Sequence, residues 1–248
     1  MKDLKLVLHG SSHFLEHHHQ FQTRLRHAVR ELESTHRQQL FSAVHIHARG
    51  GAEMSQGFIH NFRDTVKEFN RRGFAQIHVI LLGDNDLRRA IRSGGQEKGH
   101  WKALQLKSST KKVLRIVDDT KDCFIIVISP LPSPKFRRYL SCFHSASRLM
   151  KEAVTESMSP NATFINTFRR WTTPIYHRRT GDVTALKIVN EFFSNDGVHL
   201  NRDGVEDLIM DIATTLLRVP SCYYPSDLRF HLNMRFYNDD LRSLLNTR

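Results

Sequence analysis

The sequence contains few cysteines and no long apolar segment. Only 3 of its 248 residues are cysteines, and Cys123, Cys142 and Cys222 lie far apart with no Cys-x-x-Cys spacing. This pattern argues against a disulfide framework and favours a reducing compartment. The longest apolar stretches, 77–82 and 124–128, have the length of strands, whereas a membrane-spanning helix needs roughly 20 such residues. We therefore predict no membrane-spanning segment.

The start of the chain does not resemble a signal peptide. The apolar run after Met1 is too short for the hydrophobic region of a signal peptide. It leads into Ser11-Ser12-His13 instead of a small-residue cleavage site. Internal repeats and low-complexity tracts are also missing from the sequence. We expect a cytoplasmic or nuclear protein.

Acidic residues are outnumbered by basic ones. The chain has 37 Lys and Arg against 25 Asp and Glu, which gives a formal net charge of +12. An excess of this size attracts polyanions, although it also serves solubility. Basic pairs recur at Arg71-Arg72, Arg88-Arg89, Lys111-Lys112, Arg137-Arg138, Arg169-Arg170 and Arg178-Arg179. One pair alone is typical of a solvated face, but several pairs on one face would bind phosphates. RNA or another polyanion is therefore a candidate partner.

Apolar runs alternate with turns and with helical segments along the chain. Strands are predicted at 5–9, 43–47, 76–82, 123–129 and 163–166, and helices at 14–32, 58–70, about 136–157 and 202–217. Unbroken apolar strands are typical of a parallel sheet that helices cover on both faces. The predicted fold is therefore α/β, a three-layer α/β/α arrangement around a five-stranded parallel sheet.

The sequence predicts one domain and a C-terminal tail. The only linker-like stretch is the loop 170–182, so residues 1–218 are expected to form a single domain. Residues 219–248 follow as a tail, in which 228–245 is amphipathic. This segment is either docked on the domain or a partner-binding helix, and no pattern specifies an oligomeric state.

Several residues that suit a hydrolase follow the predicted strands. Ser12 comes after the first strand, at the head of a predicted helix whose dipole favours negative charge. Asp196 and His199 are three residues apart, so the carboxylate can hold one imidazole nitrogen while the other faces a nucleophile. Gly51 offers an unshielded backbone N–H and Asn85 a side-chain amide for an oxyanion. Because parallel strands end at one edge of a sheet, we expect these residues to converge.

Each of these residues also has a common structural role. Ser12 and Asp196 are typical helix caps. Gly51 and Asn85 are typical turn residues that tolerate a left-handed backbone. Only the occurrence of all of them after successive elements favours a catalytic site over these structural roles.

Four blocks of the sequence resemble SGNH (GDSL-type) hydrolases in order and spacing. They are Gly10-Ser11-Ser12, Gly50-Gly51-Ala52, Gly83-Asp84-Asn85-Asp86 and Asp196-Gly197-Val198-His199. The resemblance covers about 4–217 and implies the flavodoxin-like fold of these enzymes. It also implies a nucleophile at Ser12, a base at His199 oriented by Asp196, and oxyanion donors at Gly51, Asn85 and the Ser12 amide. Gly50 is an alternative to Gly51 as donor.

The first block departs from the family pattern, and two branches of the family are especially similar. Ser11 stands where the family usually has an acidic residue before the nucleophile. The sequence around His199 is similar to that of the esterase-like domain in the first open-reading-frame protein of LINE-type retrotransposons. Oskar-type RNA-binding domains share the fold without the catalytic residues. The resemblance thus implies a serine esterase that hydrolyses an acyl or acetyl ester, with a catalytically idle RNA-binding module as the alternative.

The sixteen histidines raise the question of a metal site. His13 and His17 are four residues apart, and His45 and His47 alternate on a predicted strand. No His-Glu-x-x-His motif or cysteine pair accompanies them, and isolated histidines on a helix are usually surface residues. We predict no metal site and no cofactor.

Overall fold

A computed structural model describes residues 3–15, 19–35, 40–176 and 183–219. The predicted C-terminal tail, apart from Val219, lies outside the described residues. No helix of the described part is long and apolar enough to cross a membrane.

A five-stranded parallel sheet forms the centre of the structure. Its strands are β1 (Leu4–Gly10), β2 (Ala43–Ala48), β3 (Ala75–Leu81), β4 (Cys123–Ile128) and β5 (Ala162–Ile165), in the spatial order β2-β1-β3-β4-β5. Every residue of β3 and β4 is buried, as expected of strands that are covered on both faces. The predicted five-stranded parallel sheet is confirmed.

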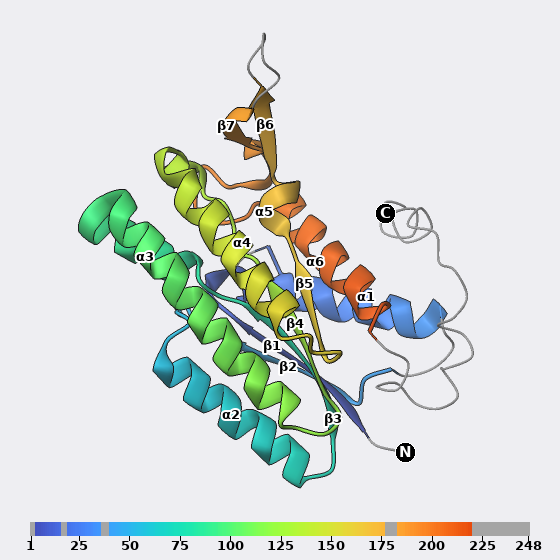
Figure 1. The fold of residues 1–248 in the computed structure, drawn as a ribbon. Helices are drawn as coiled ribbons and strands as arrows, with labels where there is room; N and C mark the ends of the chain where they lie inside the picture. Colours follow the sequence, from blue (N-terminus) through green and yellow to red (C-terminus); the bar gives the residue numbers. More distant parts are fainter. Residues whose placement is uncertain (1–2, 16–18, 36–39, 177–182, 220–248) are drawn as a thin grey trace.

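Helices cover both faces of the sheet (Figure 1). Helices α1 (Phe21–Thr35) and α6 (Arg202–Leu216) pack together on one face. Helices α2 (Gln56–Arg71), α3 (Asp84–Asp118) and α4 (Leu140–Glu156) cover the other face, where α3 packs along both of its neighbours. This is the predicted three-layer α/β/α arrangement, with the strand order typical of the flavodoxin-like fold.

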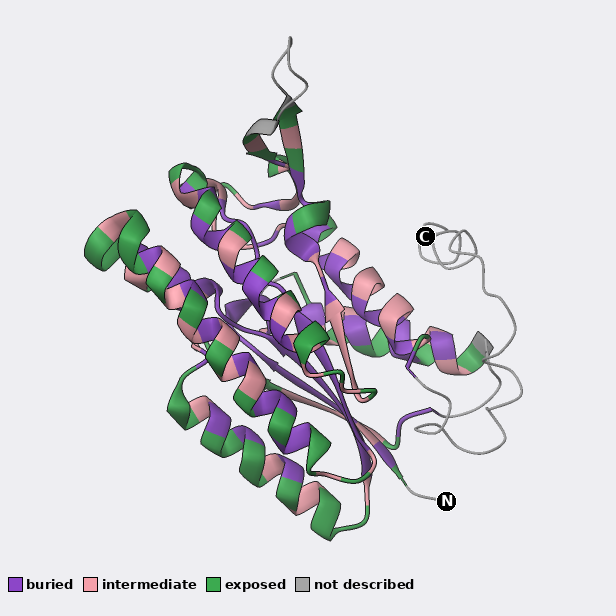
Figure 2. Ribbon diagram, viewed as in Figure 1, coloured by how far each residue is buried: buried purple, intermediate pink, exposed green. Residues whose placement is uncertain are grey.

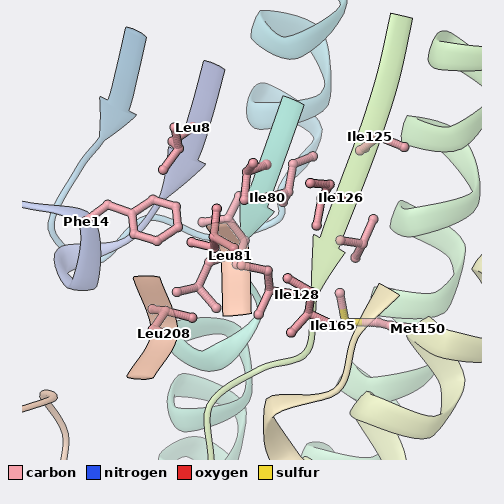
Figure 3. Close-up of a cluster of buried hydrophobic side chains, with 14 of the residues drawn as sticks. Leu8, Phe14, Ile80, Leu81, Ile125, Ile126, Ile128, Met150, Ile165 and Leu208 are labelled. Atoms are coloured by element: carbon pink, nitrogen blue, oxygen red, sulfur yellow. The ribbon is translucent and has the colours of Figure 1, made fainter. Parts of the chain in front are cut away.

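The sheet and the inward faces of the helices form one continuous hydrophobic core (Figure 2). Leu8 and Leu81 of the sheet lie near Phe14 and near Leu208 of α6, as Figure 3 shows. On the side of β4, Ile128 and Met150 of α4 are fully buried. This packing fixes the carboxyl ends of β1 and β3, where the candidate site lies.

The first predicted helix is wrong at its start. Residues 12–14 form a short 3-10 helix, η1 (Ser12–Phe14), and α1 begins only at Phe21. Phe14 folds back across Gly10, where a Cβ atom would lie only 2.3 Å from the Phe14 ring. This contact turns the chain, and His19 and Gln20 then adopt left-handed backbone angles, which interrupt any helix.

The helix predicted from about 136 also begins later, at Leu140. Residues Pro134–Tyr139 form a second 3-10 helix, η2, and Phe136 has a non-helical backbone. The Lys135 N–H, which has no acceptor within a helix that begins here, donates to the carbonyl of Gly197 at 3.0 Å.

The predicted linker-like loop 170–182 proves to be partly strand. β6 (Thr172–Tyr176) pairs antiparallel with β7 (Val183–Ile188), and the hairpin extends beyond the N-terminal end of α4 (Figure 1). Its base is anchored by Trp171, which is fully buried and donates from Nε1 to Asp207 of α6 at 2.7 Å. Both strands are edges of a two-stranded sheet, so Pro174 is tolerated there.

Candidate active site

The carboxyl edge of the sheet brings together the predicted site residues of distant blocks. Ser12 follows β1, the Gly50-Gly51 turn follows β2 and Asn85 lies in the first turn of α3, after β3. The Asp196–His199 loop connects the 3-10 helix η3 (Asn190–Phe192) to α6. An isolated bridge between Phe193 and Leu200 closes the base of this loop.

Ser12, His199 and Asp196 lie in one hydrogen-bonded row. The Ser12 Oγ atom lies 3.1 Å from His199 Nε2. The other ring nitrogen, Nδ1, lies 2.5 Å from Oδ2 of Asp196. Because a carboxylate only accepts, Nδ1 carries the proton and Nε2 is left as an acceptor for the Ser12 hydroxyl. The row therefore has the polarity that proton removal from Ser12 requires.

The loop itself holds Asp196 ionised. Burial raises the pKa of Asp196, but hydrogen bonds from the backbone N–H groups of His199 and Val198 and from the His199 ring outweigh it and lower the pKa to about 2. The two N–H groups each donate to Oδ1 at 2.9 Å. One carboxylate thus stabilises the loop with one oxygen and orients His199 with the other.

Gly197, which has a left-handed backbone, and the loop that follows β4 hold this segment against the domain. Gly197 has a φ of 63°, which glycine adopts without strain. Its carbonyl accepts hydrogen bonds from Ser133 Oγ at 2.6 Å and from the Lys135 N–H at 3.0 Å. The position of His199 therefore depends on the segment after β4, a dependence that the sequence pattern does not show.

Ser12 has a different environment from the predicted helix head. It belongs to the three-residue η1 and its relative exposure is 8%. Because η1 has a single turn, no long helix dipole points at Ser12. The neighbouring Ser11 is buried, and among the described residues its Oγ has no hydrogen-bond partner. The residue that departs from the family pattern thus faces the interior rather than the site.

The turn after β2 and the start of α3 are bonded to each other. Asn85 Nδ2 donates to the carbonyl of Ala52 at 3.1 Å, and Asp86 Oδ2 accepts from the Met54 N–H at 2.8 Å. Gly51 has a φ of 71° and is exposed, as Gly50 is. The amide of Asn85 has two protons, so its bond to Ala52 leaves one N–H for another acceptor.

A cleft lies beside this turn. It has a volume of about 910 Å³ and opens between β1, β2 and α2, with Gly10 and Gly51 among its lining residues. Its apolar lining includes Phe58 and Phe62 of α2. The cleft provides space next to the Gly51 side of the site.

A buried charge network lies next to the site, and none of the sequence motifs predicts it. Asp84 Oδ2 accepts from Arg88 Nη2 at 2.8 Å and lies 3.2 Å from Nε2 of His13. All three side chains are almost completely buried. Arg88 was expected in a solvated basic pair, and this is wrong because it neutralises Asp84 in the interior. The available signals were the adjacency of His13 to Ser12 and the four-residue spacing of Asp84 and Arg88.

This network connects the candidate nucleophile and base to Asn85. The ring of His13 lies 5.7 Å from the ring of His199, and Arg88 Nη2 donates to Asn85 Oδ1 at 2.5 Å. Burial raises the pKa of Asp84, but the charge of Arg88 and the hydrogen bond from His13 outweigh it and lower the pKa to about 2. Asp84 is therefore ionised and paired with Arg88 next to the site.

Asp86 has the opposite electrostatic balance. Burial raises its pKa to about 6, against the hydrogen bond from the Met54 N–H and the charge of Lys102. Lys102 Nζ lies 3.5 Å from Asp86 Oδ1. Near neutral pH the protein therefore bears the cost of ionising a buried carboxyl group.

We expect Asp86→Asn to change the pH dependence of stability. In the unfolded chain Asp86 ionises near its ordinary pKa, while in the folded protein it ionises near 6. Its contribution is therefore fully present below pH 4 and is lost as the pH rises through 6. Between pH 4 and pH 7 the variant should gain about 2–3 kcal/mol of unfolding free energy relative to the parent. Urea titrations at both pH values measure the difference, and parallel pH profiles would contradict it.

His9 of β1 and His78 of β3 form a buried pair, whereas His45 of β2 is half-buried and His47 is exposed. His78 Nε2 donates to Gln76 Oε1 at 2.8 Å, so its Nδ1 accepts from His9 Nε2 at 3.0 Å. Burial lowers the pKa of both rings, that of His78 to about 3. Within the described part of the chain, no group of three or more His, Cys, Asp or Glu could hold a metal ion. His17 lies outside the described residues.

Solved structures with the same fold are lipases and esterases. The lipase/acylhydrolase of Enterococcus faecalis is 16% identical, with a TM-score of 0.57 over 87% of this chain and 95% of its own. A lipase from a goat rumen metagenome is 16% identical, with a TM-score of 0.58 over 86% and 97%. A variant of Axe2, an acetyl xylan esterase of Geobacillus stearothermophilus, is 14% identical, with a TM-score of 0.55 over 86% and 93%. No protein-family model and no curated protein sequence matches the chain.

These comparisons define the class of the fold. The chain has the three-layer α/β/α fold of SGNH-type lipases and esterases, a hydrolase fold. At 14–16% identity the likeness concerns the fold alone. The chemistry of this chain has to be argued from its own residues.

Proposed function

We propose that the protein is a serine esterase that hydrolyses an acyl or acetyl ester with Ser12 as nucleophile. The observation that carries this proposal is the row Ser12–His199–Asp196, with contacts of 3.1 and 2.5 Å. Helix caps and turn residues have no reason to form such a row across 187 positions of sequence. The esterase and lipase folds of the structural neighbours also support an ester as substrate.

The first half of the reaction acylates Ser12. His199 Nε2 removes the hydroxyl proton while Oγ attacks the carbonyl carbon of the ester, and Asp196 stabilises the imidazolium that forms. The tetrahedral intermediate then collapses, the ester C–O bond breaks, and His199 gives its proton to the departing alcohol. The cleft beside Gly51 gives the acyl group space.

The second half releases the acid. His199 removes a proton from a water molecule, the water oxygen attacks the acyl carbon, and the Ser12 oxygen leaves with the proton from His199. We assign stabilisation of both oxyanions to the backbone N–H groups of Ser12 and Gly51 and to the second N–H of the Asn85 amide. The bond from Asn85 to Ala52 fixes this amide before the substrate arrives, which is the pre-organisation that such stabilisation requires.

Covalent labelling tests the nucleophile directly. A fluorophosphonate is expected to phosphonylate Ser12 with loss of fluoride, and mass spectrometry of the digested full chain locates the adduct. Ser11→Ala is the matched control, because Ser11 is the adjacent serine and its Oγ is buried without a partner among the described residues. This variant should label like the parent, whereas Ser12→Ala should not label.

Hydrolysis of p-nitrophenyl acetate and of a longer-chain homologue completes the test. We expect turnover in the parent and in Ser11→Ala, because neither loses the Ser12–His199 contact. A parent chain that neither labels nor hydrolyses either ester would overturn the proposal and favour a catalytically idle domain.

A further inference from the structure

A groove lined by cations lies between α4 and the β6–β7 hairpin. It has a volume of about 1110 Å³. Five of its lining residues are basic, and they come from three separate elements: Arg137, Arg138, Arg148, Lys151 and Arg169. Its lining contains no Asp or Glu. The groove therefore concentrates positive charge that is scattered in the sequence.

These cations are available to a ligand. All five are exposed. Arg148 pairs with Glu152 on its own helix, whereas the other four form no ion pair within the described part of the chain. Cations that gather in a groove whose lining has no acidic residue repel one another, and an anionic ligand would relieve this repulsion.

The opposite wall of the groove has a different character. The hairpin contributes Pro174, Ala185 and Leu186. On the floor, the exposed ring of His144 stacks on Phe168, with centroids 5.5 Å apart and an interplanar angle of 29°. Phe168 is buried and so holds this flat ring in place. The groove thus combines a cationic wall with an apolar wall and a flat ring.

We propose that this groove binds single-stranded nucleic acid, with its phosphates along the cations and its bases toward His144 and the hairpin. A single strand has charge on one side and flat, largely apolar bases on the other, which matches the two walls. A duplex buries its base faces, so the apolar wall would have no partner. The proposal concerns binding and does not depend on the esterase activity.

The groove begins next to the candidate active site. Arg137 and Arg138 lie in η2, in which the Lys135 N–H donates to the carbonyl of Gly197, between Asp196 and His199. A strand bound in the groove would therefore end close to the loop that holds His199.

A charge-matched pair of variants tests the groove. The first is Arg138→Gln/Lys151→Gln/Arg169→Gln. The control removes the same charge from the groove between α2 and α3 by Arg63→Gln/Lys67→Gln/Arg115→Gln; these residues are also exposed, but that groove contains Asp119. The probe is a fluorescein-labelled uridine oligomer, and anisotropy titrations of the full chain are repeated over a range of salt concentrations.

Loss of three phosphate contacts should make the slope of log K, the association constant, against log salt concentration less negative by about 2. Binding should weaken roughly 100-fold at 0.1 M salt. The control variant should bind like the parent. His144→Ala should weaken binding about tenfold without changing the salt slope, because stacking releases no counterions.

Three results would overturn the proposal. They are no binding of the oligomer by the parent, equal losses in the two triple variants, and binding of the parent to phosphatidylserine vesicles but not to the oligomer. Circular dichroism melting curves of both variants verify that they fold. Since none of these readouts involves ester hydrolysis, failure here leaves the proposed esterase untouched, and the reverse also holds.

Discussion

Replacing Ser12 with Ala is expected to lower kcat for p-nitrophenyl acetate by about 10⁴-fold or more, and His199→Ala by a similar factor. The physical reason is that each group works only through the other. Ser12 is a weak nucleophile until His199 Nε2, at 3.1 Å, takes its proton. His199 in turn has no catalytic role when the hydroxyl is missing.

The kcat of the double variant Ser12→Ala/His199→Ala should therefore be no lower than that of the less active single variant. Non-additivity of this kind is expected of groups that act as one unit. His60→Ala is the control for removal of an exposed imidazole and should retain the parent rate. Losses that multiply in the double variant would show that the two residues act independently and would contradict the shared step.

The sheet and the approximate place of the site were accessible from the sequence. Strand β4 is a continuous apolar run, and only burial on both faces explains such a run. Once the strands are parallel, their carboxyl ends must meet, so Ser12 and Asn85 fall on the same edge. The distance between Ser12 and His199 was beyond the sequence, because it depends on how Ser133 and Lys135 hold the carbonyl of Gly197.

The elements that the sequence mispredicted are those that long-range contacts decide. The segment 14–20 has no Pro or Gly, so its sequence predicts a helix. The packing of Phe14 across Gly10 instead ends the helical turn at Phe14. The hairpin of β6 and β7 has weak local signals and depends on Trp171, which is buried against α6. Local propensity is a weak guide wherever tertiary packing of this kind intervenes.

The buried charge network was missed for a related reason. Arg88 and Arg89 are adjacent in sequence, yet Arg88 is 5% exposed, while Arg89 is on the surface with a contact to Glu53. On a helix, neighbours in sequence point about 100° apart, so one member of a basic pair can face the interior. Only a buried partner such as Asp84 makes that position tolerable for a cation.

Removal of Asp84 is expected to cause the largest loss of stability among these variants. Asp84→Ala should lower the free energy of unfolding by about 3–5 kcal/mol, because it leaves the Arg88 guanidinium buried without a counter-charge. The two side chains are only 1% and 6% exposed, so water does not compensate. The matched control is Arg71→Ala, which removes an exposed ion pair with Glu68 and should cost no more than about 1 kcal/mol. Urea unfolding at pH 7 measures both values.

The double variant Asp84→Leu/Arg88→Met distinguishes a lost charge partner from a lost packing contact. If the cost of Asp84→Ala comes from the unpaired guanidinium, removal of both charges should recover most of it, because replacing a buried ion pair with apolar side chains is often nearly neutral. This origin would be contradicted if the double variant lost as much unfolding free energy as the single variants at Asp84 and Arg88 lose together. Recovery of stability without recovery of ester hydrolysis is the further expected result, since Arg88 also holds Asn85 Oδ1 at 2.5 Å. The network would then stabilise the fold through its charges and position the oxyanion amide through its geometry.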